Sequence, residues 1–286
     1  MTRPQPDRRA PPTAPRVSVV QMSCDPGDVG ANLARAERLV ATAAEQGASL
    51  AVLPEMCTAG SFAGDRLPAL AESIPGPTTA RIGALAAKHR LYLVVGLPER
   101  GDDGFYNASV LVAPDGTLVG SYRKVHLFSG EKEHFRSGDR PALFDTQIGR
   151  VALTICYDLI FPEYIRGLVL AGAQLIVNST NWITDDWQTG RGWGGPVVRS
   201  LAATRALENT VHVAMADQVG TAGGWKSLGH SCLTAPSGGL LAQLADGEGV
   251  ATGVAALQDR GWDDWRTIAS YLRDRRTDLY PRLADL

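Results

Sequence analysis

Three apolar runs in this chain each end in a residue whose side chain could take part in covalent chemistry. Each run has the length and composition of a buried strand, and α/β sheets place their ligands at the carboxyl ends of strands. A thiol can act as a nucleophile, a carboxylate as a general base and an ammonium as the partner of an oxyanion. Together they suggest covalent acyl chemistry. The runs and the residues that follow them are 50–54 with Glu55, 118–123 with Lys124, and 151–155 with Cys156.

Each of the three residues has a simpler explanation when it is considered alone. Free cysteine is among the most buried residue types, so Cys156 could be a small buried hydrophobe. Glu55 could cap the turn that follows it, and Lys124 could be a solvated charge at a hairpin end. Two observations favour chemistry: the polar pair Tyr157 and Asp158 follows the thiol, and lysine is scarce, since the chain has four Lys and 24 Arg.

A second carboxylate near Lys124 could orient its ammonium or help to position a substrate. Glu131 and Glu133 are both candidates, because they lie seven and nine residues beyond Lys124. The alternative is a solvated charged loop. Position in the sequence does not choose between the two glutamates.

The elements that must position these residues alternate between short apolar runs and helical patterns. Residues 28–46 predict a helix, with apolar side chains at helical spacing and Gly47 placed to end it. Alternating strands and helices with interspersed hairpins indicate one α/β domain with mixed sheets. The other expected helices are 78–90, 162–171 and 197–209, the strands are 17–21, 50–53, 92–97, 151–155, 175–178 and 211–216, and the hairpins are 108–121 and 231–244.

Composition excludes several classes of protein. The formal net charge of −2 gives no reason to expect nucleic acid or anionic lipid as a partner. No run approaches the roughly 20 apolar residues that span a bilayer, so no membrane association is expected. The four cysteines are far apart and the histidines form no metal-binding motif, so we expect reduced thiols, no metal and a cytoplasmic setting.

The two ends of the chain differ from its body. Residues 1–15 contain five prolines and predict a disordered tail. Residues 259–286 form a C-terminal extension that includes Trp262 and Trp265, and exposed tryptophans would be costly in a monomer. We therefore expect this extension to pack on the body or on a partner subunit, in a homodimer or a higher homo-oligomer.

Three segments around the candidate residues resemble the signature motifs of the nitrilase superfamily of carbon-nitrogen hydrolases. They are Leu-Pro-Glu-Met at 53–56, Tyr-Arg-Lys-Val-His-Leu-Phe at 122–128, and Ile-Cys-Tyr-Asp-Leu-Ile-Phe-Pro-Glu at 155–163. Shorter similarities occur at 19–22, 106–108 and 205–209, so the resemblance runs from about residue 17 to residue 280. Three motifs in the right order and spacing are far more specific than any one of them.

The resemblance implies a fold and roles for particular residues. The fold would be a four-layer α-β-β-α sandwich with mixed sheets, in which residues 16–258 form the carbon-nitrogen hydrolase domain. It makes Cys156 the nucleophile, Glu55 the general base and Lys124 the oxyanion cation, without a cofactor. Glu131 matches the auxiliary glutamate of the family better than Glu133 does. The expected substrate-binding residues are Tyr157, which also supplies an oxyanion N–H, Asn181, Trp182 and Tyr106.

The residues after the nucleophile indicate the branch. True nitrilases usually follow the cysteine with Trp-Glu or Gly-Glu, whereas Cys156 is followed by Tyr157 and Asp158, as in the amidase branches. We therefore expect hydrolysis of a small-molecule amide through a thioester intermediate. The alternatives are a nitrilase, an N-carbamoyl amidohydrolase, an acyltransferase and a non-catalytic binding module. An N-carbamoyl enzyme needs an arginine to clamp the substrate carboxylate, and the candidates are Arg166, Arg191 and Arg199.

A segment rich in tryptophan follows Asn181. Trp182, Trp187 and Trp193 fall within residues 182–196, together with a glycine-rich run. The segment could form a lid or a pocket wall, and its aromatic rings and nearby carboxylates would suit a substrate with an apolar or cationic acyl part. The alternative is that the tryptophans only attach a long loop to the body.

Overall fold

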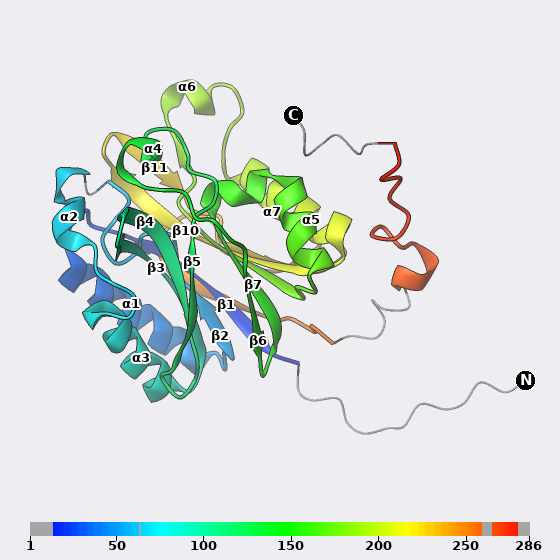
Figure 1. Cartoon of the computed structure of the whole chain (residues 1–286), viewed down its shortest axis with the longest axis horizontal. Coiled ribbons are helices and arrows are strands. Elements are labelled where there is room, and N and C mark those ends of the chain that lie inside the picture. Colours follow the sequence, from blue (N-terminus) through cyan, green and yellow to red (C-terminus); the bar gives the residue numbers. More distant parts are fainter. Residues whose placement is uncertain (1–13, 63, 259–264, 280–286) are drawn as a thin grey trace, which may run out of the picture.

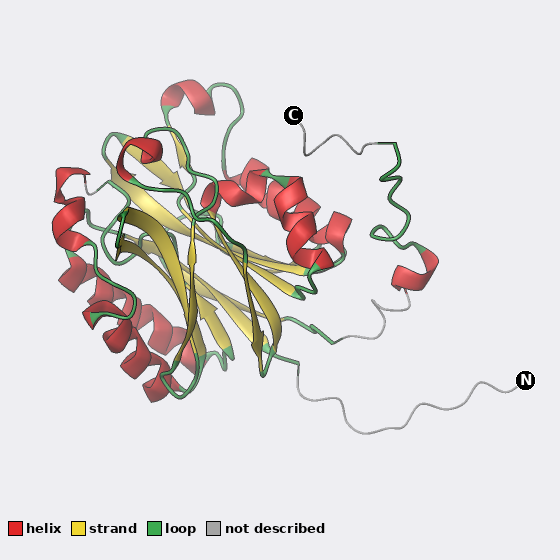
Figure 2. Cartoon of the chain, viewed as in Figure 1, coloured by secondary structure: helices red, strands yellow, loops and turns green. Residues whose placement is uncertain are grey.

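Two β-sheets lie face to face between two layers of helices in the computed structural model of the chain, which describes residues 14–62, 64–258 and 265–279 (Figures 1 and 2). In sheet order, the first sheet consists of β5 (Leu118–Arg123), β4 (Gly104–Val112), β3 (Tyr92–Gly101), β2 (Leu50–Val52), β1 (Arg16–Ser23) and β14 (Gly249–Val254). The second consists of β6 (Ala142–Thr146), β7 (Gly149–Ile155), β8 (Leu175–Thr180), β10 (His212–Ala222), β12 (Cys232–Thr234) and β13 (Leu240–Gln243).

Both sheets are mixed, as predicted. In the first, β1, β2 and β3 run parallel, while β4, β5 and β14 are antiparallel to their neighbours. In the second, β7, β8 and β10 run parallel, while β6, β12 and β13 are antiparallel. The carboxyl end of β1 pairs in parallel with β10, Met22 with Gln218 and Ser23 with Val219, and this pairing joins the two sheets. Two short strands, β9 (Ile183–Thr184) and β11 (Trp225–Leu228), extend β10.

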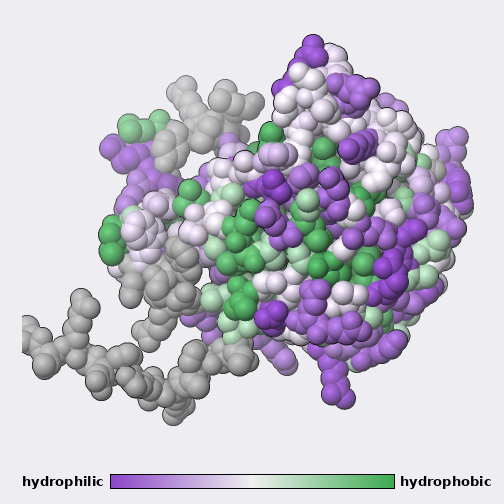
Figure 3. All heavy atoms as spheres, turned by 180° about the vertical axis from the view of Figure 1, so that it is seen from behind, coloured by the Kyte–Doolittle hydropathy of each residue, from purple (hydrophilic) through white to green (hydrophobic). Residues whose placement is uncertain are grey.

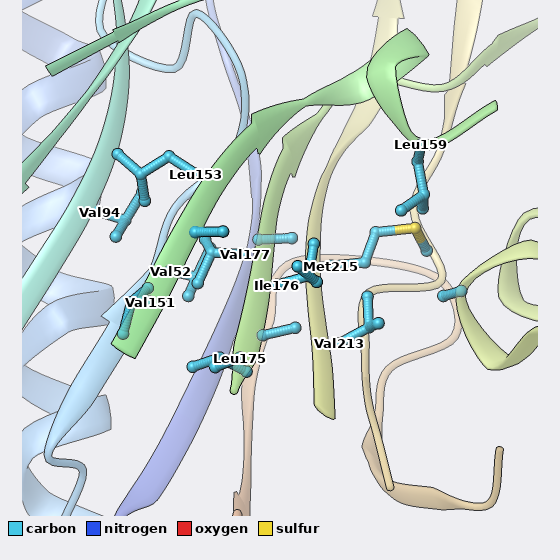
Figure 4. Packing of buried hydrophobic residues seen from close by; sticks show 14 of the residues in the cluster. Val52, Val94, Val151, Leu153, Leu159, Leu175, Ile176, Val177, Val213 and Met215 are labelled. Atoms are coloured by element: carbon cyan, nitrogen blue, oxygen red, sulfur yellow. The ribbon is translucent and has the colours of Figure 1, made fainter. Parts of the chain in front are cut away.

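The main core fills the space between the sheets. Val52 and Val94 of the first sheet pack against Val151, Leu153 and Val177 of the second, and all five side chains are completely buried (Figure 4). These strands read as continuous apolar runs because both of their faces are covered. Their carboxyl ends are therefore held in fixed relative positions by close-packed side chains.

Helices cover the two outer faces. α1 (Val29–Glu45) and α3 (Pro77–His89) pack on the first sheet through Leu39, Val40 and Ile82. α5 (Pro162–Leu170) and α7 (Gly195–Asn209) pack on the second sheet through a set that includes Ile165 and Val198. The short pieces are α2 (Leu67–Leu70), α4 (Glu131–His134), α6 (Asp186–Thr189) and the 3₁₀ turns η1 (Gly64–Arg66) and η2 (Cys156–Ile160). The four-layer sandwich is confirmed.

Local signals explain where α1 begins and ends. The Asp28 side chain accepts a hydrogen bond from the N–H of Ala31, which satisfies a free donor in the first turn. Gly47 adopts a φ of +75°, in the left-handed region, just beyond the C-cap residue Gln46. The predicted helix, 28–46, therefore agrees with the observed one to within a residue at each end.

Four strands were not expected from the sequence: β6, β9, β11 and β14. β9 has two residues, and the other three are only partly buried, so their sequences carry no clear apolar pattern. Pairing with neighbouring strands determines their conformation instead. No helix in the described ranges is long and apolar enough to cross a bilayer.

The predictions for the two ends of the chain remain predictions. The expected disordered tail, 1–15, falls almost entirely outside the described residues, as does Trp262. Of the C-terminal extension, the structure describes 265–279. Within this part, the Arg266 guanidinium donates to the carbonyl oxygen of Thr210, and Leu272 packs against the main core.

Candidate active site

The three predicted catalytic side chains meet at one end of the sandwich. Glu55 follows β2, Lys124 follows β5 and Cys156 follows β7, so the first two come from one sheet and the third from the other. All three are buried, with relative exposures of 4%, 1% and 6%. Polar and ionisable groups at such depth need partners, because burying them unpaired costs several kcal/mol.

The Glu55 carboxylate accepts three hydrogen bonds. Its Oε1 accepts from Lys124 Nζ and from Asn107 Nδ2, both at 2.7 Å. Its Oε2 accepts from the backbone N–H of Asn181 at 2.9 Å. These donors come from β4, β5 and the end of β8, so three different strands fix one carboxylate.

The Lys124 ammonium lies between two carboxylates. Its Nζ donates to Glu55 Oε1 and to Glu131 Oε2, each at 2.7 Å. Glu131 is itself held, because its Oε1 accepts from Asn107 Nδ2 at 2.8 Å and its Oε2 accepts from the N–H of Phe128 at 2.7 Å. Glu133 is exposed to solvent. The structure thus brings Glu131, and not Glu133, to the two residues of the first sheet.

Cys156 occupies a strained turn where β7 passes into η2. Its φ is +44°, in the left-handed region that non-glycine residues seldom adopt, and such strain is concentrated at functional sites. The Asn178 side chain donates to the Cys156 carbonyl oxygen at 3.4 Å. Because Ile155 pairs with Ser179 in the parallel register of β7 and β8, the residues after Ser179 lie beside the thiol.

Asp158 ties the Cys156 turn to the Lys124 strand. Its Oδ2 accepts from the Tyr122 hydroxyl at 2.7 Å and from the N–H of Ile155 at 2.8 Å. Its Oδ1 accepts from the N–H of His126 at 3.0 Å and contacts His126 Nδ1 at 2.8 Å. A fully buried carboxylate with this many donors links one sheet to the other at the site. The sequence showed only a polar residue here.

Burial and mutual charge shift the pKa values of the three groups. Burial raises the pKa of the Cys156 thiol well above its usual value, Glu55 raises it further, and Lys124 opposes them only in part. Burial also raises the pKa of Glu55, against the opposing effect of Lys124. For Lys124, burial would lower the pKa, but the charges of Glu55, Cys156 and Glu131 raise it overall. The resting site therefore holds a neutral thiol beside an ammonium.

Two of the predicted substrate-binding residues lie beside the triad. One contacts it through a backbone hydrogen bond, and the other follows the nucleophile in the sequence. Asn181 donates its N–H to Glu55, while its Oδ1 accepts from the Ser227 hydroxyl at 2.7 Å. Tyr157 immediately follows the nucleophile, and its ring packs edge-on against Phe128 and Phe161. Its N–H is therefore close to Cys156 by covalent geometry, as an oxyanion donor must be.

The structure does not bring Tyr106 to the triad. Its hydroxyl donates to Asp103 at 2.7 Å, and the Arg123 guanidinium lies 3.8 Å from the centre of its ring. The next residue, Asn107, is the one that contacts Glu55 and Glu131, because successive side chains of a strand point to opposite faces. The signal that could have found it was a polar residue inside the apolar run of β4.

The tryptophan segment is attached to the body at two points. Trp182 is buried, and its ring lies edge-on to that of Trp193. Trp193 Nε1 donates to the carbonyl oxygen of Ile183, within the segment, at 2.9 Å, and the Trp193 side chain packs against the main core. Trp187, on α6, is 63% exposed, and the Arg191 guanidinium lies over its ring at 3.9 Å. Two tryptophans thus anchor the loop, while the third projects from it.

The candidate arginines of an N-carbamoyl enzyme differ in their surroundings. Arg191 is engaged with Trp187, and Arg199 Nη1 donates to Gln243 Oε1 at 3.3 Å. Arg166 lies on α5, outside the hydrogen bonds that join the triad. Within the described ranges, no group of three or more His, Cys, Asp or Glu side chains could hold a metal ion.

Comparison with known proteins decides the family. A model of the family described as carbon-nitrogen hydrolase matches residues 16–267. The chain belongs to the carbon-nitrogen hydrolase family. A nitrilase of Pyrococcus abyssi is 34% identical to this hydrolase over 276 residues, covering 93% of this chain and 99% of that protein. An omega-amidase of Xenopus tropicalis is 32% identical over 283 residues, covering 93% and 96%.

A solved structure extends the comparison to the fold. An amidase from Nesterenkonia sp. AN1, a cysteine-to-alanine mutant in complex with butyramide, superimposes on this hydrolase with a TM-score of 0.81. The two chains are 27% identical, and the match covers 95% of this chain and 97% of that one. The predictions of the nitrilase superfamily, of its amidase-like branch and of an enzyme are confirmed.

Proposed function

We propose that this carbon-nitrogen hydrolase converts a small-molecule amide into a carboxylic acid and ammonia or an amine, through a thioester on Cys156. The observation that carries the proposal is the buried cluster in which Lys124 Nζ lies 2.7 Å from both Glu55 and Glu131, beside the strained Cys156 turn. In a glutamate-to-glutamine mutant of the structurally similar amidase from Nesterenkonia sp. AN1, the acetamide moiety of fluoroacetamide adds covalently at the active-site cysteine. This supports a nucleophilic role for Cys156.

In the first half of the reaction, Glu55 takes the proton of the Cys156 thiol as the sulfur attacks the amide carbonyl carbon. A C–S bond forms, and the carbonyl oxygen becomes an oxyanion that Lys124 and the N–H of Tyr157 stabilise. The tetrahedral intermediate collapses when the C–N bond breaks. Glu55 gives its proton to the departing nitrogen, which leaves a thioester.

In the second half, Glu55 takes a proton from water, and the resulting hydroxyl attacks the thioester carbon. The same two donors stabilise the second oxyanion. The C–S bond then breaks, and the proton held by Glu55 returns to the sulfur. The net change is one amide and one water converted into one acid and one amine, with the thiol restored.

Glu131 and Asn107 hold the first two catalytic groups in place. Glu131 gives the ammonium of Lys124 a second carboxylate partner, and the Asn107 amide bridges the two carboxylates with its two N–H bonds. These contacts fix the position of Lys124 relative to the general base. Both are positioning residues in this proposal.

Release of ammonia tests the proposed function. Primary aliphatic amides should be turned over fastest, ahead of N-carbamoyl compounds and nitriles, because Cys156 is followed by Tyr157 and Asp158. Cys156→Ala, Glu55→Gln and Lys124→Ala should each abolish most turnover, since residues that act as a unit give similar losses. A nitrile hydrolysed faster than every amide would assign the chain to a nitrilase, and an acyl adduct transferred only to amines would assign it to a transferase.

We further propose that the hydrolase acts as a cytoplasmic homodimer. The cysteines, all in the described part of the chain, are free, which suits a reducing compartment. Large apolar side chains are exposed on the outer helices and on β13 and β14, and apolar surface is also visible on the face shown in Figure 3. The exposed residues on α5 and α7 are Leu170, Val197 and Leu207.

A further inference from the structure

Asp217 is a fully buried carboxyl group to which the proposed reaction assigns no role. It lies on β10 with a relative exposure of 0%. Its Oδ1 accepts two backbone hydrogen bonds, from Trp182 N–H at 3.0 Å and from Gln218 N–H at 2.8 Å. Its Oδ2 has no hydrogen-bond partner among the described residues. An ionised carboxylate with one oxygen buried and unpaired would be costly, whereas a carboxylic acid would not carry that charge.

Both residues that donate to Asp217 are also connected to Glu55 by hydrogen bonds, one through its neighbour in the chain and the other through its own side chain. Trp182 follows Asn181, whose own N–H donates to Glu55 Oε2 at 2.9 Å. The Gln218 side chain donates to the carbonyl oxygen of Glu55 at 2.7 Å. One oxygen of Asp217 therefore accepts hydrogen bonds from two segments. One segment holds the Glu55 carboxylate, and the other holds the Glu55 backbone.

The charges around Asp217 favour its neutral form. Burial raises the pKa of its carboxyl group well above the usual value, and the two backbone N–H groups lower it only in part. The Glu55 carboxylate raises it further. A second negative charge here would also oppose ionisation of Glu55, because like charges disfavour each other's charged forms.

We propose that Asp217 is a positioning residue of the active site. It is a neutral carboxylic acid whose Oδ1 accepts hydrogen bonds from the two segments that hold Glu55. The inference rests on the proposed function, in which Glu55 is the general base. Asp217 touches neither the substrate nor the reacting atoms in this arrangement. It acts by limiting the positions that the Glu55 carboxylate can adopt.

Replacement by the matching amide separates this role from that of a charge. Asp217→Asn retains the Oδ1 acceptor and a neutral side chain, so kcat/KM should stay within about threefold of wild type. The acid limb of its pH profile should be unchanged. Asp217→Leu removes the acceptor and should lower kcat by about 10- to 100-fold with a smaller change in KM, as expected when general-base geometry is lost.

Two results would overturn the proposal. One is an Asp217→Asn enzyme as impaired as Asp217→Leu. The other is an acid limb that moves to lower pH in Asp217→Asn, because removing a negative charge near Glu55 lowers the pKa of Glu55 and shows that Asp217 was ionised. If Asp217→Leu does not fold, the pH profile of Asp217→Asn still decides between the outcomes.

Asp158 provides a matched control, since it is also fully buried beside the triad. Both of its oxygens accept hydrogen bonds, from the N–H of Ile155 on one side and from the N–H of His126 on the other. In Asp158→Asn, either orientation of the amide places an NH₂ group against a backbone N–H. Asp158→Asn should therefore lose stability or activity, whereas Asp217→Asn should not. If the enzyme tolerates both substitutions equally, the number of accepting oxygens does not explain the role of Asp217.

Infrared spectroscopy tests the protonation state without turnover. Wild-type enzyme should show the carbonyl band of a protonated carboxylic acid that persists above the ordinary titration range of aspartate and disappears in Asp217→Asn. An active enzyme without the band overturns this inference alone. Inactivity on every amide, with the band present, overturns the proposed function and leaves the protonation of Asp217 established.

Discussion

At the scale of single residues, the site is a buried cluster with one more carboxylate than ammonium. One ammonium, Lys124, lies between two carboxylates, and the Asn107 amide donates to both of them. The neutral thiol of Cys156 adds no charge until a substrate arrives. In the proposed mechanism, the nucleophile is therefore activated by proton transfer to Glu55 during the reaction, and not by a thiolate formed in advance.

Replacing Asn107 tests whether the bridging amide matters. Asn107→Leu removes two hydrogen bonds to charged groups, each worth about 1.5 to 3 kcal/mol, so kcat/KM should fall by at least 10-fold. Tyr106→Phe is the matched control, because Tyr106 is the adjacent residue on β4 and makes its hydroxyl contact with Asp103 instead. Steady-state kinetics on one amide compare the two, and a Tyr106→Phe enzyme that loses as much would restore Tyr106 to the site.

The pH dependence of kcat/KM follows from the direction of the Glu55 shift. Glu55 must be ionised to accept the thiol proton, and its pKa is raised by burial, so activity should fall as the pH drops through this raised value. The acid limb should therefore lie above the ordinary glutamate range.

The rate of Cys156 alkylation should show no thiolate plateau near neutral pH, because the pKa of the thiol is raised. A rapid plateau at pH 6 would contradict a neutral resting thiol.

At the scale of elements, the ends of β2, β5 and β7 place the catalytic groups, and close backbone packing leaves them little freedom. Gly96 on β3 lies directly behind the Glu55 turn. A Cβ added there would meet the Pro54 carbonyl oxygen at 2.5 Å and Met56 N at 2.6 Å. Both contacts are with backbone, which cannot rotate away as a side chain can.

Gly96→Ala should therefore displace the turn that carries Glu55. We expect a loss of stability of about 1 to 3 kcal/mol, typical of an overpacked core, together with a large loss of kcat. Gly167→Ala is the control, because nothing lies within 4 Å of its added Cβ and the residue is inside α5. That change should be neutral or stabilising by about 0.5 to 1 kcal/mol. Denaturant unfolding and ammonia release measure both effects, and similar behaviour of the two variants would contradict the account.

The elements that carry the triad could be predicted from the sequence because each contains a short run with apolar residues that ends next to a polar residue. The contacts that Asn107 and Asp158 make around the candidate site could not, since they depend on which face of a strand points inward and on how two sheets meet. Tyr106 and Asn107 are adjacent on β4, and adjacent side chains of a strand point to opposite faces of the sheet. The two residues therefore have different surroundings. The strands β6, β11 and β14 could not be predicted for a related reason. Pairing with neighbouring strands makes them extended, and their local sequence pattern does not.

At the scale of the whole molecule, the helix layer on the second sheet exposes large apolar side chains in the described part of the chain. Exposed Leu170, Val197 and Leu207 lie on α5 and α7, which cover the second sheet. A homodimer that buries this face should have about twice the 30.4 kDa mass of the chain in light scattering. Leu207→Arg should shift the mass toward one chain while leaving the fold intact, and an unchanged mass in this variant would place the interface elsewhere.

The central claim is that a substrate acyl group becomes attached to Cys156 during turnover. Rapid acid quenching of the enzyme with a primary amide, followed by intact-protein mass spectrometry, measures this most directly. We predict a mass increase equal to the acyl group in wild type, located on Cys156 by peptide mapping and absent in Cys156→Ala, which should release no ammonia above background. Sustained ammonia release by Cys156→Ala would contradict the mechanism.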